Sequence, residues 1–357
     1  MRTGIADLPL HRGKVPRWLF TRMCQLAREI TIFMVDQWGS EQMLNRLSDP
    51  FWFQSLGCVL GFDWHSSGVT TTVCGALKVG LRGLEKELGL WVTGGKGRVS
   101  QRTPQEIRLG AEAISVDGED LVYASRMAAK VDSSALQDGH QIYHHCFFFD
   151  RAGSWAVVQQ GLNPRTGFAR RYHWLSSQME DFVHEPHAAV CAQAVAKPLN
   201  LVARESEQAR ATITSLAAQR PDCLVADMRK LQRLCLPRRH HIVLQDIHPH
   251  RLKNGFLTTY QRQPENFETL LSLKGVGPKT IRALSLISEL IHGVKPSFRD
   301  PARFAFAHGG KDGHPFPVNR HGYDESIQIL RRAVEKARVG RRERAEAMGR
   351  LNRMGKV

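Results

Sequence analysis

The sequence has no long hydrophobic run, no closely spaced cysteine pair and too few acidic residues to balance its basic ones. No stretch approaches about 18 uninterrupted apolar residues, so we expect no membrane span. The N-terminal segment MRTGIADLPLHRGK lacks the apolar core of a secretory signal. The seven cysteines are odd in number and scattered, without a Cys-x-x-Cys pair, which disfavours a disulfide framework and a zinc ribbon. These absences predict a reduced, cytoplasmic protein with free thiols.

The shortage of acidic residues leaves a strong positive charge. Fifty Lys and Arg stand against 34 Asp and Glu in 357 residues, a formal net charge of +16. A surplus of this size favours a polyanionic partner, nucleic acid first and an anionic membrane surface second. Residues 331–357 carry ten Lys and Arg against three Glu. This segment is interpreted equally well as a phosphate-contacting tail or as a solvated helix with a frayed end.

The composition and the spacing of apolar residues change along the chain and predict four regions. They are a mixed α/β domain at 1–165, a helical connecting region at 166–220, a helical domain at 221–340 and a basic tail at 341–357. In the first region, Gln141–Phe149 and Ser154–Gln159 have the composition of two strands joined by a hairpin turn. Met179–Val195 in the second region has a helical pattern. The predicted fold class is therefore α+β, with a mainly α-helical C-terminal domain.

The strongest functional signal lies in Gln263–Gly293. A short helix ends near Leu273, Gly275-Val276-Gly277 predicts a tight turn, and Pro278 is suited to the first position of a second helix. This pattern resembles the helix-hairpin-helix motif of DNA-repair and DNA-processing proteins. Glycines allow the backbone to approach a phosphate, and the N–H groups at a helix N-terminus favour an anion. The predicted DNA contacts are Gly275, Gly277, Lys279 and Thr280; an αα-hairpin with a purely structural turn is the alternative.

The same motif offers a catalytic hypothesis. In helix-hairpin-helix glycosylases, a Lys in Gly-Val-Gly-x-Lys-Thr attacks the sugar, and an Asp at the start of a later helix assists it. Lys279 and Asp300 match these places, although Lys274 stands where a Pro is usual and Ile281 where an Ala is usual. The alternative is a phosphate contact at Lys279 and a helix cap at Asp300.

Three glycine–lysine segments are candidates for further phosphate contacts, with Lys14, Lys96 and Lys311 as their cations. Residues 94–102 in particular predict a mobile, phosphate-touching loop. None of the three segments matches a Walker A loop, so a nucleotide triphosphatase is not expected.

The N-terminal half offers a nuclease hypothesis. Carboxylates with a nearby imidazole hold Mg²⁺ or Mn²⁺ in metal-dependent nucleases. The candidate catalytic residues are Asp63, His65, Asp132 and Asp138, and the candidate metal ligands are Asp132, Asp138 and His144. Helix capping is the simpler interpretation of the loop at 61–68. His184 and His187 form another histidine pair, but Pro186 disturbs a helix there.

Long strings spread over the chain resemble the family called domain of unknown function 763. They are IADLPLHRGKVPRWLF, DPFWFQSLGCVLGFDWHSSGVTTTVCGALK, YASRMAAKVDSSALQDGHQIYHH, WAVVQQGLN, GVGPKTIRALSLISELIHG and DPARFAFAHGGKDG. The resemblance covers nearly the full length and implies no particular reaction or catalytic residue.

Three hypotheses follow from the sequence. The first is a protein that binds the DNA backbone without sequence preference, of the repair or processing type. The second is an enzyme on DNA, either the metal-dependent nuclease or the Lys279 lyase. The third is an RNA-binding or assembly protein in which the hairpin is a docking surface.

Overall fold

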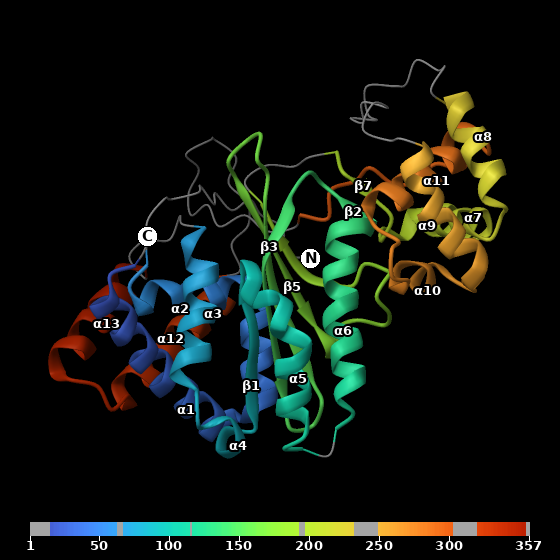
Figure 1. The fold of residues 1–357 in the computed structure, drawn as a ribbon. Coiled ribbons are helices and arrows are strands. Elements are labelled where there is room, and N and C mark those ends of the chain that lie inside the picture. The colour runs from blue at the N-terminus through green and yellow to red at the C-terminus, as the bar shows by residue number, and fades with distance from the viewer. Residues whose placement is uncertain are drawn as a thin grey trace, which may run out of the picture.

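A five-stranded antiparallel sheet with helices on both faces forms the centre of the molecule (Figure 1). The structure, a computed structural model, describes residues 15–62, 67–114, 116–192, 197–231, 249–302 and 320–354. The strand order is β1 (Leu90–Lys96), β3 (Gln141–Asp150), β4 (Trp155–Leu162), β5 (Ala169–Leu175) and β6 (His187–Cys191). A small second sheet pairs β2 (Leu136–Gln137) with β7 (Leu199–Asn200). The protein therefore mixes helix and sheet, as predicted.

The predicted β-hairpin is confirmed as strands β3 and β4. Asp150 accepts hydrogen bonds from the N–H groups of Ala152 and Ser154, at 3.0 Å each, and these bonds close the turn. Successive strand residues point to opposite faces of the sheet, so Phe147 and Phe148 enter different cores. Because helices cover both faces, these strands are apolar along most of their length.

One face of the sheet is covered by helices from both ends of the chain. They are α1 (Arg17–Ser48), α2 (Pro50–Leu60), α3 (Gly68–Gly80), α12 (Arg320–Lys336) and α13 (Arg341–Met354). The short α4 (Glu85–Leu88) leads into β1. Two helical segments meet inside α1 at Gly39, whose φ of 81° is suited to glycine.

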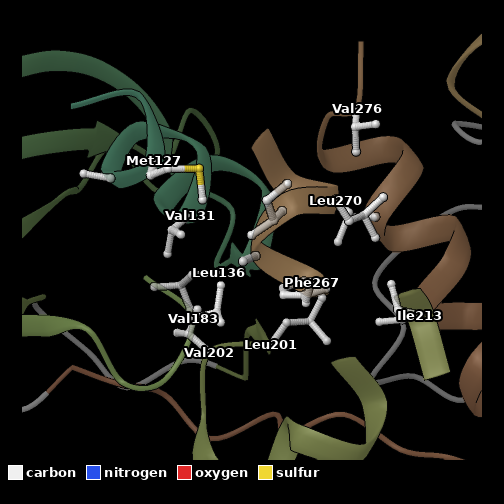
Figure 2. Close-up of a cluster of buried hydrophobic side chains, with 14 of the residues drawn as sticks. Met127, Val131, Leu136, Val183, Leu201, Val202, Ile213, Phe267, Leu270 and Val276 are labelled. Atoms are coloured by element: carbon white, nitrogen blue, oxygen red, sulfur yellow. The ribbon is translucent and has the colours of Figure 1, made fainter. Parts of the chain in front are cut away.

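The other face carries α5 (Thr103–Ala111) and α6 (Gly118–Lys130), and a cluster of further helices packs against α6 and the short turn that follows it. The cluster contains α7 (Glu207–Ala217), α8 (Pro221–Leu231), α9 (Pro249–Arg262), α10 (Phe267–Ser272) and α11 (Pro278–Leu290). Short helical turns complete this list: η1 (Gly97–Arg102), η2 (Val131–Ala135), η3 (Ser176–Gln178) and η4 (Arg204–Ser206). Figure 2 shows Met127 of α6 on the same core as Ile213 of α7 and Leu270 of α10.

Three local predictions require correction. The described part of Met179–Val195, residues 179–192, is not an α-helix, because His187–Cys191 forms β6 and pairs with β5. The region 166–220 therefore contributes two strands to the central sheet, and among its described residues the α-helix α7 lies near its end. Residues 94–102 are not a loop: Gly94–Lys96 ends β1 and residues 97–102 form a 3₁₀ turn.

The C-terminal helices also pack differently from the prediction. Helices α12 and α13 do not join α8–α11 but pack against α1 and α2, where Leu330 and Leu351 are fully buried. The segment expected as a basic tail is thus mostly a helix with a buried apolar side. None of the helices that the structure describes has the length and apolar character that a bilayer span requires.

Candidate nucleic-acid interface and buried polar cluster

The turn between α10 and α11 presents a backbone surface to solvent. Gly275 has a φ of 88°, and Gly277 is extended at φ −136°, ψ −173°. Val276 between them is 1% exposed and anchors the turn in the core (Figure 2). Pro278 then begins α11, whose first turn has no side-chain cap. The N–H groups of this first turn therefore remain available for an anion.

Lys130, the last residue of α6, supports the turn from inside. Its Nζ donates to the carbonyl of Leu273 at 3.1 Å and to the carbonyl of Val276. Gln137 Nε2 donates to the carbonyl of Pro278 at 2.9 Å. Burial lowers the pKa of Lys130. These bonds occupy the carbonyls of the turn on the side facing the protein.

The predicted DNA contacts differ in their access to solvent. Lys279 and Gly275 are exposed, and a Cβ placed on Gly277 would meet no heavy atom within 4 Å. Thr280 is only 5% exposed, and its Oγ1 lies 2.8 Å from the position of a Cβ on Gly255. Thr280 therefore packs against α9 through its side chain. Only its backbone N–H faces the start of the helix.

Of the other predicted phosphate contacts, Lys96 is the one among the described residues. Lys96 is exposed at the end of the edge strand β1, with its Nζ 5.6 Å from the centre of the Tyr143 ring. Lys14 and Lys311 lie outside the described residues, as do the nuclease candidates Asp63 and His65.

A buried polar cluster occupies the sheet face that carries α6. Asp132 lies in η2, a π-helical turn, and is fully buried. Its Oδ1 contacts His187 Nε2 at 2.5 Å, and its Oδ2 accepts from Gln159 at 2.6 Å and from Trp174 Nε1 at 3.0 Å. Burial raises the pKa of Asp132, and the contact with His187 opposes this shift. The network continues through Gln159 Oε1 to His145 at 2.8 Å.

The side chain of Arg170 is surrounded by two buried carboxylates, those of Asp138 and Asp300. The guanidinium donates to Asp138 Oδ2 at 3.0 Å and to both oxygens of Asp300, at 3.0 and 2.8 Å. Tyr172 also donates to Asp138, at 2.6 Å. Burial alone would raise the pKa of Asp138, but Arg170, His140 and Tyr172 hold it at about 2. Asp138 is therefore ionised at neutral pH and acts as the counter-ion of a buried arginine.

These contacts do not assemble the metal site predicted from Asp132, Asp138 and His144. The oxygens of both carboxylates already face nitrogen or hydroxyl donors. His144 lies on the opposite sheet face, as strand alternation requires. There it adjoins Cys74. Burial raises the pKa of the Cys74 thiol, but Cys146 and His144 lower this pKa to about 6. Within the described ranges, no three His, Cys, Asp or Glu residues lie close enough to bind a metal ion.

The two residues of the lyase hypothesis, Lys279 and Asp300, also lie in different environments. The side chain of Asp300 is buried and bound to Arg170, and its Oδ1 also accepts from the N–H of Ala302 at 2.9 Å. Lys279 is exposed on the α10–α11 turn. Asp300 thus has a structural role in the buried cluster.

Sequence reasoning missed Lys130 and Arg170, and it named His187 only as one of a histidine pair, without connecting it with Asp132. Lys130 supports the turn, while Arg170 and His187 complete the buried cluster. A signal for Arg170 was present, because two arginines interrupt an otherwise aromatic strand pattern in FARRYHW. No local signal links Lys130 to Val276, which is 146 residues away.

The fold and these sites define an α+β protein with an exposed glycine turn and a buried carboxylate cluster. A family model described as a protein of unknown function (DUF763) matches residues 4–318. Because the match covers most of the chain, the protein belongs to this family. No curated protein and no solved structure matches the chain.

Proposed function

We propose that α10, the Leu273–Gly277 turn and α11 form a helix-hairpin-helix that binds the DNA backbone without reading its sequence. The N-terminus of α11 carries the proposal. It has no side-chain cap, Gly277 leaves open space in front of it, and Lys279 is exposed beside it. Uncapped N–H groups, a close backbone approach and a cation together favour a phosphate.

The contacts behind the turn support this proposal. Carbonyl oxygens near a phosphate would repel it, but those of Leu273 and Val276 accept from Lys130 on the protein side. These two carbonyls are therefore occupied on the protein side of the turn and do not oppose a phosphate at the N-terminus of α11. In this arrangement Thr280 contributes its N–H, because its hydroxyl packs on Gly255.

Charge around the turn favours the same partner. Lys274 is exposed within the turn, and the whole chain carries a net charge of +16. Contacts to phosphates fix a protein on nucleic acid but carry no sequence information directly. Binding should therefore be tolerant of sequence and strongly dependent on salt.

The experiment is a fluorescence anisotropy titration of a labelled DNA duplex at several salt concentrations. Lys279→Ala should weaken binding by about 1–2 kcal/mol and lower the salt slope by about one. Lys86→Ala is the matched control, because Lys86 is exposed on α4, far from the helix cluster (Figure 1). Equal affinities and slopes for the Lys279 variant and the native protein would reject the turn as the contact.

The same samples distinguish the alternative functions. Tighter binding of folded RNA than of the duplex would favour the RNA-binding alternative. Cleavage of an abasic duplex in EDTA that disappears with Lys279→Ala would favour the lyase, and Mn²⁺-dependent cleavage would favour the nuclease.

A further inference from the structure

A cavity of about 230 Å³ lies between α1 and α12, away from the α10–α11 turn. Met34 and Ile329 line its apolar part, and both side chains are buried. Trp38 lines it at the point where the two segments of α1 meet at Gly39. The cavity therefore combines an apolar floor with an aromatic wall.

The Trp38 ring is held in place and remains accessible. It packs edge-to-face against Phe33, with the ring centres 5.6 Å apart, yet 39% of the residue is exposed. An indole fixed on one side and open to solvent can stack on a planar ligand. Stacking of bases on aromatic side chains is a main source of affinity for single-stranded nucleic acid.

Polar groups of suitable chemistry surround the ring. Gln42 lines the cavity, and its carbonyl oxygen accepts from Asn45 at 3.0 Å, so the amide N–H groups are the part of this side chain left to donate. Arg46 is paired with Glu325 at 2.6 Å. Arg332 is exposed at the rim and forms no ion pair or hydrogen bond with the side chains that the structure describes. The rim thus offers an amide, the Arg332 cation and the Arg46–Glu325 ion pair, whose acid also lines the cavity.

Positive charge continues from the rim along the chain. The exposed cations from the last turns of α12 to the start of α13 are Arg331, Arg332, Lys336, Arg338, Arg341 and Arg342. Glu335 is the one exposed acid in residues 331–342. Arg342 is paired with Glu346 at 3.0 Å, and Arg332 is the cation of this group that lines the cavity. A strand whose base entered the cavity would bring a phosphate to Arg332 first.

We propose that this cavity binds one unpaired base of single-stranded nucleic acid. The base stacks on Trp38, an edge of the base accepts from the Gln42 amide, and the adjoining phosphate binds Arg332. This inference extends the proposed affinity for nucleic acid but does not use the α10–α11 turn. Each site can therefore fail without the other.

The test is photo-crosslinking of a short single-stranded DNA that carries one 5-iodouracil. Near-ultraviolet irradiation of the complex, followed by peptide mass spectrometry, should locate the crosslink on Trp38. Trp38→Ala should remove that crosslink and weaken single-strand binding about tenfold, whereas Trp38→Phe should retain most of the affinity because it keeps a stacking ring. An RNA strand of the same sequence identifies which sugar is preferred.

Trp18→Ala is the matched control, because Trp18 is a second exposed tryptophan on α1 that does not line the cavity. It should leave both the crosslink and the affinity unchanged. A crosslink confined to other residues, or equal affinities for Trp38→Ala and the native protein, would overturn the inference. Loss of duplex binding in Lys279→Ala with an intact Trp38 crosslink would separate the two sites, and thermal unfolding would verify that the Trp38 variants are folded.

Discussion

Gly275 and Gly277 have different physical requirements, although both belong to one Gly-Val-Gly turn. Gly275 adopts a positive φ of 88°, where a side chain is strained. Gly277 has an extended backbone that any residue can adopt, and the space next to it is open. The fold thus requires a glycine only at the first position. The proposed DNA contact would account for a glycine at the second position, because a phosphate could then come close to the backbone.

Substitution by alanine separates these two requirements. Gly277→Ala should leave the free energy of unfolding unchanged or raise it by up to ~1 kcal/mol, because the unfolded chain loses freedom. It should nevertheless weaken DNA binding, and Gly277→Val should weaken it further. Gly275→Ala should lower stability by about 1–2 kcal/mol. Urea unfolding and duplex anisotropy measure the two effects, and native affinity in folded Gly277→Val would leave the turn with a structural role only.

The ionisation of Asp138 makes the free energy of unfolding depend on pH in the acid range. Its pKa of about 2 in the folded state lies below the ordinary value of 3.8. A carboxylate with a depressed pKa stabilises the fold at a pH above the unfolded value, and this contribution is lost as the pH falls from about 4 to about 2. The shift corresponds to roughly 2 kcal/mol.

Asp138→Asn should therefore be destabilised most at neutral pH. Removing one partner from the buried Arg170 site should lower the free energy of unfolding by roughly 3 kcal/mol at pH 7. The difference from the native protein should narrow as the pH falls from 4 toward 2. Urea unfolding at a series of pH values measures this difference. A difference that stayed constant with pH would contradict the assigned role of Asp138.

At the scale of elements, the α10–α11 turn depends on the end of α6. Lys130 donates to two carbonyls of the turn, and its removal leaves both without this donor. Lys130→Met should lower the free energy of unfolding by about 2 kcal/mol. It should also weaken DNA binding, although residue 130 lies behind the turn and makes no contact with DNA in the proposed complex. Hydrogen exchange should quicken at residues 273–277.

Arg126→Met provides the control for this variant, because Arg126 is exposed on the same helix. It should leave the exchange rates of the turn unchanged. Equal exchange rates in Lys130→Met and the native protein would mean that the turn holds its shape without α6.

Elements with a strong local pattern were predictable, and those specified by distant partners were not. Strands β3 and β4 were evident because aromatic and β-branched residues flank a turn. Strand β6 was missed because Ala, Glu and Gln in 179–195 favour a helix, a preference that pairing with β5 overrides. His187 therefore could not be connected with Asp132, 55 residues away. The α10–α11 turn was accessible because its signal is local.

At the scale of the whole molecule, the basic C-terminal segment is part of the core. Leu351 of α13 is fully buried in the cluster that contains α1 and α2. Leu351→Ala should lower the free energy of unfolding by about 2–4 kcal/mol. Arg342→Ala, at an exposed position of the same helix, should change it by less than ~0.5 kcal/mol. Thermal or urea unfolding measures both free energies. A Leu351→Ala protein as stable as the native protein would mean that the fold does not depend on this segment.

The packing of α12 and α13 on α1 and α2 also has a consequence for synthesis of the chain. The apolar surface of residues 17–60 is completed by side chains of residues 329–351. A ribosome adds about 5–20 residues each second, so this apolar surface stays exposed for many seconds before residues 329–351 are synthesised. Contacts between sequence-distant segments also form slowly. We expect the nascent chain to engage chaperones through α1 and α2, and to release them only when the last helices emerge.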